Sequence, residues 1–430
     1  MCNARGSAAG VVLEVVAMRS SHLFSVPSHC AAQRRRLAPV LAPLVTFVVA
    51  ITMMVPAVAF ARQRRSHPAA AERAQQDKLS EPYAAALLME PETGTVMFEN
   101  NAHKAWPTAS LAKMMIAMIV ASKLGDGSLK LSDRITASRN AADMGGSQVY
   151  LKEGETFSLD DMMKAIMVHS ANDASVAVAE YVGGSTEAFV QMMNREAAAL
   201  GMKDTHYYSV HGLPPGPGQQ ADVSSAWDEA LLARELIKYP QVMQWASIDS
   251  APFRGGAFTL RNTNHLVRTF PGCDGLKTGF YYEAGFNVVA TAHRGGMRLI
   301  AVVLGSPRKG GNFDSTSELL AQGFANYQMR VVGKQGAPIE QTLAVSGGSL
   351  ASFRPVWGGN LSVLQKRGDE AAVKIEFQLP AALAAPIRTA QQVGVGQATS
   401  GGKVIASAPL IAPTAIGQQP SLIQRLRGAL

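Results

Sequence analysis

The order of hydrophobic periodicities along the chain most constrains its fold. Two short apolar runs, residues 83–89 and 95–98, flank a Pro-Glu-Thr-Gly turn and predict a β-hairpin. Helical spacing then predominates, and a strand-like pattern returns only after residue 258. A strand pair, a helical block and further strands in this order indicate an α+β fold.

The individual elements follow from the same patterns. Helices are predicted over residues 110–124, 159–168, 174–181, 186–200, 224–237 and 317–327. Two strands, 286–292 and 297–304, are predicted around an Arg-Gly-Gly turn. Beyond about residue 336 short strands and turns prevail, and residues 373–379 alternate apolar and polar, which predicts a strand with one buried and one solvated face. We therefore expect a small β-rich domain after the α+β domain.

The first sixty residues have a different composition from the rest. Three arginines at residues 34–36 precede an uncharged stretch, residues 37–61, that ends in Ala-Phe-Ala. This arrangement is typical of a cleaved signal peptide, whereas its length also allows a transmembrane anchor across about 30 Å of bilayer. The prolines within the stretch favour cleavage. Both interpretations export the remainder of the chain, because the basic cluster stays inside.

Charge and cysteine content limit the partners of the exported part. The chain of 430 residues has a formal net charge of +8, but residues 1–61 hold five arginines and one acidic residue. The remaining 35 basic and 31 acidic side chains are too nearly balanced for a nucleic-acid groove, so we expect no nucleic-acid partner. Only Cys273 lies beyond the leader, which excludes an internal disulfide there. The histidines show no metal-ligand spacing, so no metal site is expected.

Ser110 and Lys113 form the pattern with the clearest chemistry. A serine at a helix start and a lysine three residues later lie on the same helix face. A lysine amine whose pKa is lowered can take the serine proton and so create a nucleophile. Ser110 could equally be a helix cap, and the same Ser-x-x-Lys spacing recurs at Ser306, so the spacing alone does not decide.

Two further polar motifs follow along the chain. Ser170 and Asn172 stand at a junction between two predicted helices. They either face a cleft, or the junction is an ordinary one capped by Ser170 or Asp173. Lys277, Thr278 and Gly279 precede the predicted strand pair, where they either bind a carboxylate or form an ordinary solvated turn. Each motif alone is weak. Together, and in this order, they are the motif set of penicillin-binding proteins and serine β-lactamases.

The chain resembles the low-molecular-mass penicillin-binding proteins, the serine-type D-alanyl-D-alanine carboxypeptidases. Besides the motifs, the resemblance rests on segments such as PTASLAKMM, MVHSANDA, HGLPPGPGQ, DGLKTGFYYEAGFNVVATA and MRLIAVVLG, and it extends over about residues 79–327. It implies a penicillin-binding and β-lactamase-like transpeptidase domain, with an antiparallel sheet flanked by helices and a helical subdomain. A small β-rich C-terminal domain would follow.

The resemblance also implies the activity and its setting. The protein would be a hydrolase of peptidoglycan biosynthesis, with effects on the cell wall and cell shape, that removes the terminal D-Ala from pentapeptide stems. Its partners would be peptidoglycan stem peptides ending in D-Ala-D-Ala and β-lactam antibiotics, and it would need no cofactor. With the predicted leader, this implies the periplasm or the outer face of the cytoplasmic membrane as its location.

Roles for the first two motifs follow from the resemblance. Ser110 would attack the carbonyl of the penultimate D-Ala and form an acyl-enzyme. Lys113 would take the proton of Ser110, Ser170 would relay a proton to the leaving amine, and Asn172 would hold the substrate amide. Water would then release the acyl group.

Roles for the third motif concern the substrate. Lys277 and Thr278 would hold the terminal carboxylate, and Gly279 would let the substrate backbone approach. The backbone N–H groups of Ser110 and Phe280 would form the oxyanion hole.

The chain departs from the family pattern at three places. Ala171 replaces a glycine in the second motif, which should be tolerated. Tyr281 stands where a small hydroxyl residue is frequent and is expected to narrow the pocket. Asn312 stands near the place of an arginine that helps to bind the carboxylate, so Arg308 or Lys309 would have to substitute.

The predicted organisation has five parts. They are a signal peptide or anchor at residues 1–61, a polar tether at 62–78, the serine D,D-peptidase catalytic domain at 79–332, the β-rich domain at 338–413 and a tail at 414–430. The tail ends in SLIQRLRGAL, which has leucines on one side and two arginines available for anionic lipid. It is shorter than the ~12–15 residues that an isolated helix needs, so it predicts at most a weak peripheral contact with the inner membrane.

Three alternative functions remain open on the sequence. A β-lactamase shares the serine nucleophile but in one class needs a glutamate in an E-x-x-L-N loop, and the nearest segment, residues 229–233, lacks the asparagine. A D,D-endopeptidase would use the same residues on crosslinks. A non-catalytic wall-binding relative would keep the fold, but the three intact motifs argue against lost catalysis.

Overall fold

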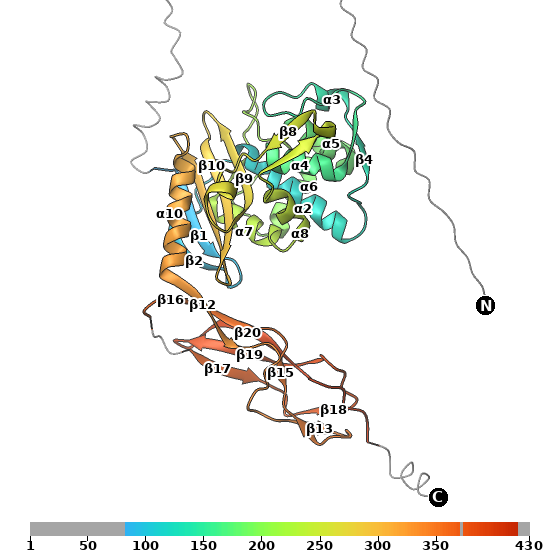
Figure 1. Ribbon diagram of the computed structural model, residues 1–430, viewed down its shortest axis with the longest axis vertical. Coiled ribbons are helices and arrows are strands. Elements are labelled where there is room, and N and C mark those ends of the chain that lie inside the picture. The colour runs from blue at the N-terminus through green and yellow to red at the C-terminus, as the bar shows by residue number, and fades with distance from the viewer. Residues whose placement is uncertain (1–81, 370–372, 420–430) are drawn as a thin grey trace, which may run out of the picture. The chain divides into compact units, whose positions relative to one another are not determined.

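The computed structural model, shown in Figure 1, describes residues 82–369 and 373–419. The predicted leader, the polar tether and the tail from residue 420 lie outside the described residues, so these interpretations stay predictions. Within the described ranges, no helix is both long and apolar enough to cross a membrane.

A five-stranded antiparallel sheet forms the centre of residues 82–326. Its strand order is β2-β1-β11-β10-β9. The hairpin β1 (Ala85–Glu90) and β2 (Thr95–Asn100) comes from the start of this region, whereas β9 (Cys273–Tyr281), β10 (Gly285–Arg294) and β11 (Met297–Ser306) come from its end. β1 pairs with β11 over five residue pairs from Ala85 opposite Leu304 to Met89 opposite Ile300. The α+β fold predicted from the order of periodicities is thereby confirmed.

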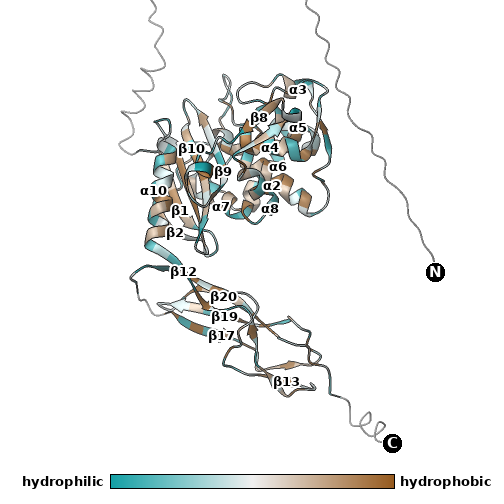
Figure 2. Ribbon diagram, viewed as in Figure 1, coloured by the Kyte–Doolittle hydropathy of each residue, from teal (hydrophilic) through white to brown (hydrophobic). Residues whose placement is uncertain are grey.

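Both faces of the sheet are covered by helices, which explains why β10 and β11 are apolar along most of their length. Alternate residues of β11 enter two different cores: Val302 packs with helix α7 (Ala226–Leu236), and Val303 packs with helix α10 (Gly311–Asn326). Hydrophobic and hydrophilic residues alternate around α10 in Figure 2, as expected for a helix with one face on a sheet. Because both faces of the sheet are packed against helices, the edge strand β9 is held in a fixed position.

The helical block surrounds α2 (Lys113–Gly125). Residues 113–121 of α2 are all buried, so this helix has no solvent-facing side over two turns. Its neighbours, visible in Figure 1, are α4 (Leu159–His169), α5 (Asn172–Gly183), α6 (Thr186–Ala199), α7 and α8 (Pro240–Ala246). A helix that is apolar all round must lie inside a domain, and the packing fixes the first turn of α2 firmly.

Short elements connect these parts. The helical ones are η1 (Ala109–Ala112), α3 (Arg139–Ala142), η2 (Arg254–Gly256) and α9 (Leu266–Thr269). The strand pairs are β3 (Trp106–Pro107) with β6 (Val223–Ser224), β4 (Arg134–Thr136) with β5 (Thr156–Ser158), and β7 (Ser250–Phe253) with β8 (Phe258–Arg261).

Two predicted helices begin three or more residues away from the expected position. The helix predicted from residue 110 starts as the 3₁₀ turn η1, with Ala109 at a φ of 49°, and becomes α-helical only at Lys113. α10 starts at Gly311 rather than at residue 317. Gly310, at a φ of 82°, forms the N-cap, and the first two residues of the helix, Gly311 and Asn312, are buried. Tertiary packing outweighs the low helix propensity of glycine there.

Residues 327–419 form a β-rich region, as predicted. β12 (Tyr327–Gly333) pairs with β16 (Leu361–Lys366), and the remaining strands are β13 (Leu343–Ser346), β14 (Ser352–Phe353), β15 (Val356–Trp357), β17 (Lys374–Gln378), β18 (Ala382–Ala384), β19 (Gln392–Ser400) and β20 (Lys403–Ile411). They enclose a core that includes Trp357, Leu361 and Leu410.

The strand predicted over residues 373–379 is β17, but its expected buried face is incomplete. Val373, Phe377 and Leu379 pack against the core, whereas Ile375 is 38% exposed. β17 is an edge strand of the order β15-β20-β19-β17, so no further strand covers it on one side. The alternation correctly predicted a strand and overstated its burial.

Candidate active site

Ser110 and Lys113 lie side by side at the start of α2. The Lys113 Nζ is 2.9 Å from the Ser110 Oγ and donates a hydrogen bond of 2.6 Å to the carbonyl oxygen of His211. Ser110 lies inside the turn η1, and the N-cap positions of η1 and α2 are Thr108 and Ala112. Ser110 is therefore not a helix cap, and its hydroxyl faces an amine that can take its proton.

Two close backbone approaches fix the turn that carries Ser110. A Cβ at Gly279 of β9 would lie 2.4 Å from the Thr108 carbonyl oxygen and 3.0 Å from the Ser110 nitrogen. A Cβ at Gly212 would lie only 2.0 Å from the carbonyl oxygen of Ala109. Only glycine fits at both places, so β9 and the segment 209–213 press on the turn from two directions.

Burial sets the protonation of the two lysines. Burial of the Lys113 amine, and after it the nearby charge of Lys277, hold the pKa of Lys113 well below its ordinary value. Burial also lowers the pKa of Lys277 to about 7. Both side chains are 0% exposed, so the charged form loses most of its hydration. A lysine in this setting can act as a base at neutral pH.

Ser170 and Asn172 form the junction between α4 and α5. Ser170 is the C-cap residue of α4, in the left-handed region at a φ of 63°, and is 4% exposed. The Asn172 Nδ2 donates to the Gly145 carbonyl at 2.7 Å, whereas its Oδ1 is buried without a hydrogen-bond partner. The acceptor capacity of that oxygen is therefore unused, although the atom is buried. Asp173, the alternative cap, instead accepts the backbone N–H groups of Val149 and Leu151.

A cavity of about 410 Å³ opens in front of Ser110. Ser110, Ser170, Thr278, Gly279 and Phe280 line it together, although they come from three separate places: η1, the junction between α4 and α5, and β9. Lys113, Asn172 and Lys277 do not line this cavity; they are buried behind its wall. The three motifs, which are spread over more than 160 residues of the chain, are thus brought to one place.

The third motif lies within β9, not on a solvated turn. The Lys277 Nζ donates to the Thr278 carbonyl at 3.1 Å, and the Thr278 Oγ1 donates to the Thr263 Oγ1 at 2.7 Å. Phe280 is 53% exposed and stacks on Phe286 with ring centroids 4.2 Å apart. The motif thus presents one hydroxyl and one aromatic face to the cavity.

The departures from the family pattern have different outcomes. Tyr281 packs against Ala109 and Ala284 and does not line the cavity, so the expectation that it narrows the pocket is wrong. Its side chain points to the opposite side of β9 from Phe280, as the two-residue period of a strand requires. Arg308 forms an ion pair with Asp314 at 2.5 Å. Lys309 and Asn312 line the cavity.

Several contributors to the site carry no motif of their own. His211 acts through its backbone carbonyl, which any residue possesses, so the sequence offers no signal beyond the segment HGLPPGPGQ. Asn287 donates to the carbonyl oxygens of Pro107 and Thr108 and accepts the Gly305 N–H at 2.6 Å, which ties the approach to Ser110 to the sheet. Thr263 is identified only by its bond to Thr278.

Cys273 is the cysteine that lies beyond the predicted leader. It is buried, and burial raises the pKa of its thiol to about 11. A thiol that stays protonated at neutral pH is a poor nucleophile. In the described residues, no group of three or more His, Cys, Asp or Glu side chains is arranged to hold a metal ion.

Comparison with known proteins gives consistent matches over most of the chain. A family model described as D-alanyl-D-alanine carboxypeptidase matches residues 71–308, and one described as penicillin-binding protein 5, C-terminal domain, matches residues 327–418. The D-alanyl-D-alanine carboxypeptidase DacF of Bacillus subtilis is 33% identical over 339 residues, covering 78% of this chain and 86% of DacF. DacC of Escherichia coli is 35% identical over 333 residues, covering 76% of this chain and 82% of DacC.

Solved structures agree with these matches. Penicillin-binding protein 5 from Haemophilus influenzae superposes with a TM-score of 0.64 at 30% identity, over 78% of this chain and 98% of that chain. Penicillin-binding protein D2 from Listeria monocytogenes, solved in the ampicillin-bound form, superposes with a TM-score of 0.52 at 32% identity, over 57% of this chain and 99% of that chain. The resemblance inferred from the motifs is confirmed: the chain belongs to the serine-type D-alanyl-D-alanine carboxypeptidase family of low-molecular-mass penicillin-binding proteins.

Proposed function

We propose that this protein hydrolyses the terminal D-Ala–D-Ala bond of peptidoglycan pentapeptide stems through an acyl-enzyme on Ser110. The observation that carries the proposal is the distance of 2.9 Å between the Lys113 amine and the Ser110 hydroxyl oxygen. Burial favours the neutral amine, which is the form that can accept a proton. A nucleophile and a base within hydrogen-bond reach are the requirement for covalent catalysis by serine.

The reaction needs no component beyond the protein, the peptide and water. The Ser110 Oγ attacks the carbonyl carbon of the penultimate D-Ala while its proton passes to the Lys113 Nζ. The N–H groups of Ser110 and Phe280 stabilise the negative oxygen of the tetrahedral intermediate. The C–N bond then breaks, Ser170 relays a proton to the departing amine, and free D-Ala leaves. Water attacks the remaining ester, which restores Ser110 and releases the shortened stem.

The walls of the cavity suit a peptide that ends in a carboxylate. The Thr278 hydroxyl, which donates to Thr263 in the free protein, can turn its proton to that carboxylate, and Lys277 adds positive charge behind it. Among the described residues that line the cavity, Lys309 is the one lysine or arginine. Arg308 does not line it and is paired with Asp314. Asn312 is uncharged and cannot replace the arginine that helps to bind the carboxylate in relatives. We therefore assign this contact to Lys309. The Oδ1 of Asn172 has no hydrogen-bond partner, and it would accept an N–H of the substrate once this side chain turns toward the cavity.

The same serine would be acylated by β-lactams, which present a strained amide and a carboxylate at a comparable spacing. The Listeria relative solved with ampicillin supports this extension. We also propose an exported location, in the periplasm or at the outer face of the cytoplasmic membrane, because the predicted leader precedes the catalytic region. A weak peripheral contact of the tail with the membrane, a role in cell shape and the absence of a nucleic-acid partner remain proposals of the same kind.

The test is the intact mass of the protein after addition of penicillin. A persistent adduct of one drug molecule that is lost in Ser110→Ala would support the proposal and identify the nucleophile. Ser306→Ala is the matched control, because Ser306 begins the other Ser-x-x-Lys sequence, and it should keep the adduct. Consumption of the drug without an adduct would indicate a β-lactamase. If the protein neither formed an adduct nor consumed the drug, the enzymatic proposal would be overturned. Release of D-Ala from a pentapeptide would then be absent as well.

A further inference from the structure

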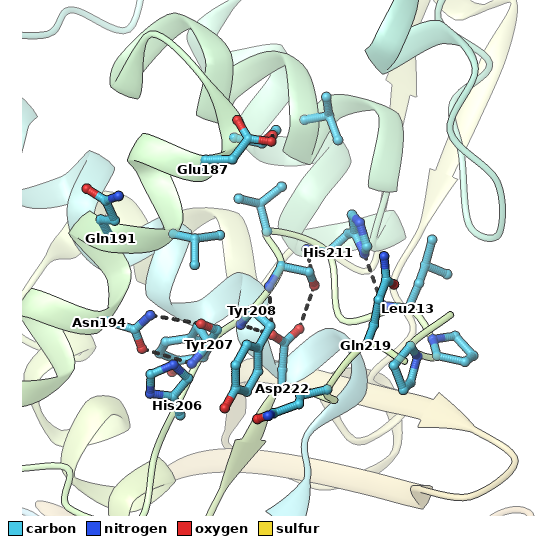
Figure 3. Close-up of a pocket in the computed structure, with 18 of the residues that line it drawn as sticks. Glu187, Gln191, Asn194, His206, Tyr207, Tyr208, His211, Leu213, Gln219 and Asp222 are labelled. Atoms are coloured by element: carbon cyan, nitrogen blue, oxygen red, sulfur yellow. Dashed lines mark hydrogen bonds between the residues drawn. The ribbon is translucent and has the colours of Figure 1, made fainter. Parts of the chain in front are cut away.

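A second cavity, larger than the one in front of Ser110, lies on the other side of the segment 209–213. Its volume is about 750 Å³, within the range of sites that enclose small ligands. One wall is a face of α6, from which Glu187, Gln191 and Asn194 project at helical spacing. The other wall is the chain from His206 to Asp222, as Figure 3 shows.

The walls of this cavity are held in place before any ligand binds. The Asn194 side chain donates to the Tyr207 carbonyl at 2.8 Å and accepts the Tyr207 N–H at 2.9 Å, which ties the two walls together. The Asp222 carboxylate accepts the N–H groups of Tyr208 and Ser209 at 2.6 and 2.8 Å, and the Ser209 hydroxyl at 2.6 Å. Both side chains are thus occupied, and the ligand must be recognised by others.

The charges around the cavity exclude anionic ligands. No lysine or arginine is among the described residues that line it. Asp222 is already satisfied, and burial lowers the pKa of His211 to about 4, so this imidazole is neutral at physiological pH. Glu187 contributes a negative charge at the rim. A phosphate, a nucleic acid or an acidic peptide would find no counter-ion here.

The side chains that remain available are suited to a neutral ligand rich in hydroxyl and amide groups. Tyr208 is 44% exposed, and its ring packs on His206 with centroids 4.4 Å apart, which presents an oriented aromatic face. Gln191 offers a free amide. The Gln219 Oε1 accepts the Gly216 N–H, so its NH₂ group is left to donate. Aromatic faces and amide groups together can bind the apolar and hydroxyl faces of a pyranose.

This cavity adjoins the proposed catalytic site through a single stretch of backbone. The His211 side chain lines the larger cavity while its carbonyl accepts from Lys113. Four residues separate the glycan from the reactive carbonyl of a pentapeptide stem, which is about 13 Å of extended chain. The sugar that carries the stem must therefore lie within that distance of Ser110, and its lactyl carboxyl is neutral because it is amide-bonded to the stem.

We propose that the cavity between α6 and the segment 206–222 binds the glycan of peptidoglycan, a neutral saccharide with hydroxyl and acetamido groups, while the attached stem reaches Ser110. This inference rests on the proposed function, because it assigns the stem-bearing sugar of the same substrate to the cavity. It makes the protein selective for stems that are still joined to sugar.

The test compares two substrates on the same protein: a free pentapeptide and the same pentapeptide on the GlcNAc–MurNAc disaccharide. We expect kcat/KM to be at least about 5-fold higher for the disaccharide-linked substrate. In Tyr208→Ala and in Gln191→Ala this ratio should fall to about 1. Tyr181→Ala is the matched control, since Tyr181 is a similarly exposed tyrosine, at 46%, that does not line the cavity. Its ratio should equal that of the unmodified protein.

Other outcomes would overturn the inference. If kcat/KM were the same for both substrates in the unmodified protein, the sugar would not be recognised. If the preference for the linked substrate persisted in Tyr208→Ala and Gln191→Ala, the sugar would bind outside this cavity. If Glu187→Gln alone raised KM for a free pentapeptide containing a diamino acid, the cavity would hold the amine of the stem instead.

Direct binding separates this inference from the proposed reaction. If the protein hydrolysed neither substrate, the proposed function would fail. Saturation-transfer NMR with the peptide-free disaccharide would still show whether the cavity binds a saccharide. Saturation transfer that is lost in Tyr208→Ala and retained in Tyr181→Ala would support the saccharide site. No transfer to the disaccharide would overturn it.

Discussion

The amine of Lys113 donates a hydrogen bond of 2.6 Å to the backbone carbonyl of His211, which lies 98 positions further along the chain. A carbonyl oxygen can only accept, so this contact keeps one N–H of Lys113 turned away from Ser110. In the neutral amine, the lone pair is then free to face the Ser110 hydroxyl at 2.9 Å. The segment 209–213 thus orients the proposed base as well as separating the two cavities.

Acylation should require neutral Lys113 and should therefore rise with pH. Burial and the nearby Lys277 charge lower the pKa of Lys113, so the rate of penicillin acylation should level off well below the ordinary lysine value of 10.5. Lys277→Gln removes a like charge, which raises the pKa of Lys113 and moves the rising limb to higher pH. The measurement is the pH profile of the second-order acylation rate. An unmoved limb would contradict the coupling, and exposed Lys152→Gln should not move it.

Gly212 should not tolerate a side chain. It has a φ of 71°, and a Cβ there would lie 2.0 Å from the Ala109 carbonyl oxygen, so Gly212→Ala must displace the turn that carries Ser110. We expect acylation to slow by about 100-fold, since an error of about 1 Å in a reacting group has this effect. Gly127→Ala is the control: its φ is 80°, but a Cβ there meets nothing within 4 Å. It should lose about 1–2 kcal/mol of stability without a change in acylation. Equal acylation rates in the two variants would argue against the close approach.

Lys309 should bind the substrate carboxylate in place of an arginine. Lys309→Gln is expected to raise KM for D-Ala-D-Ala peptides about 10-fold, equivalent to ~1.4 kcal/mol, with little effect on kcat. A peptide whose C-terminus is amidated should be processed equally by both proteins, because it offers no charge. Arg308→Gln is the control, since Arg308 is exposed and paired with Asp314. If KM stayed constant in Lys309→Gln, Lys277 and Thr278 would suffice for the carboxylate.

Glu229 should reduce stability at neutral and alkaline pH. It is fully buried in α7, and burial raises its pKa to about 8 from 4.5, while the nearby Ser224 offsets only part of this. The native state then keeps a proton that the unfolded chain releases, so the free energy of unfolding falls as the pH rises from about 4.5 to about 8.

Glu229→Gln should remove this cost. The free energy of unfolding in urea should increase by on the order of 3 kcal/mol at pH 8 and by little at pH 4.5. Glu235→Gln, at a residue of the same helix that pairs with Lys238, serves as the control and should show no such pH dependence. A gain of equal size at both pH values would point to packing rather than to ionisation.

Local patterns predicted the elements better than their ends. The hairpin β1–β2, the strand pair β10–β11 and the helices α4, α5, α6 and α7 occur where the periodicities indicated them, whereas α8 was not predicted. The exceptions arise where tertiary contacts act. α10 begins at Gly311, because Gly311 and Asn312 are buried, and Ile375 is exposed, because β17 lies at a sheet edge. The periodicity of apolar residues along one segment does not show which other segment packs against that helix or strand.

The α+β class, the β-rich C-terminal region and the three motifs could be predicted before folding was considered, because periodicity and residue order are local properties. Three features appear only in the folded protein: Ser110 lies beside Lys113 and not at a cap position, Lys113 and Lys277 are both buried, and Tyr281 faces away from the cavity. Tertiary packing also forms the cavity beside α6. These features depend on desolvation and on contacts between segments far apart in the chain, such as Gly212 against Ala109, and neither exists until the chain is packed.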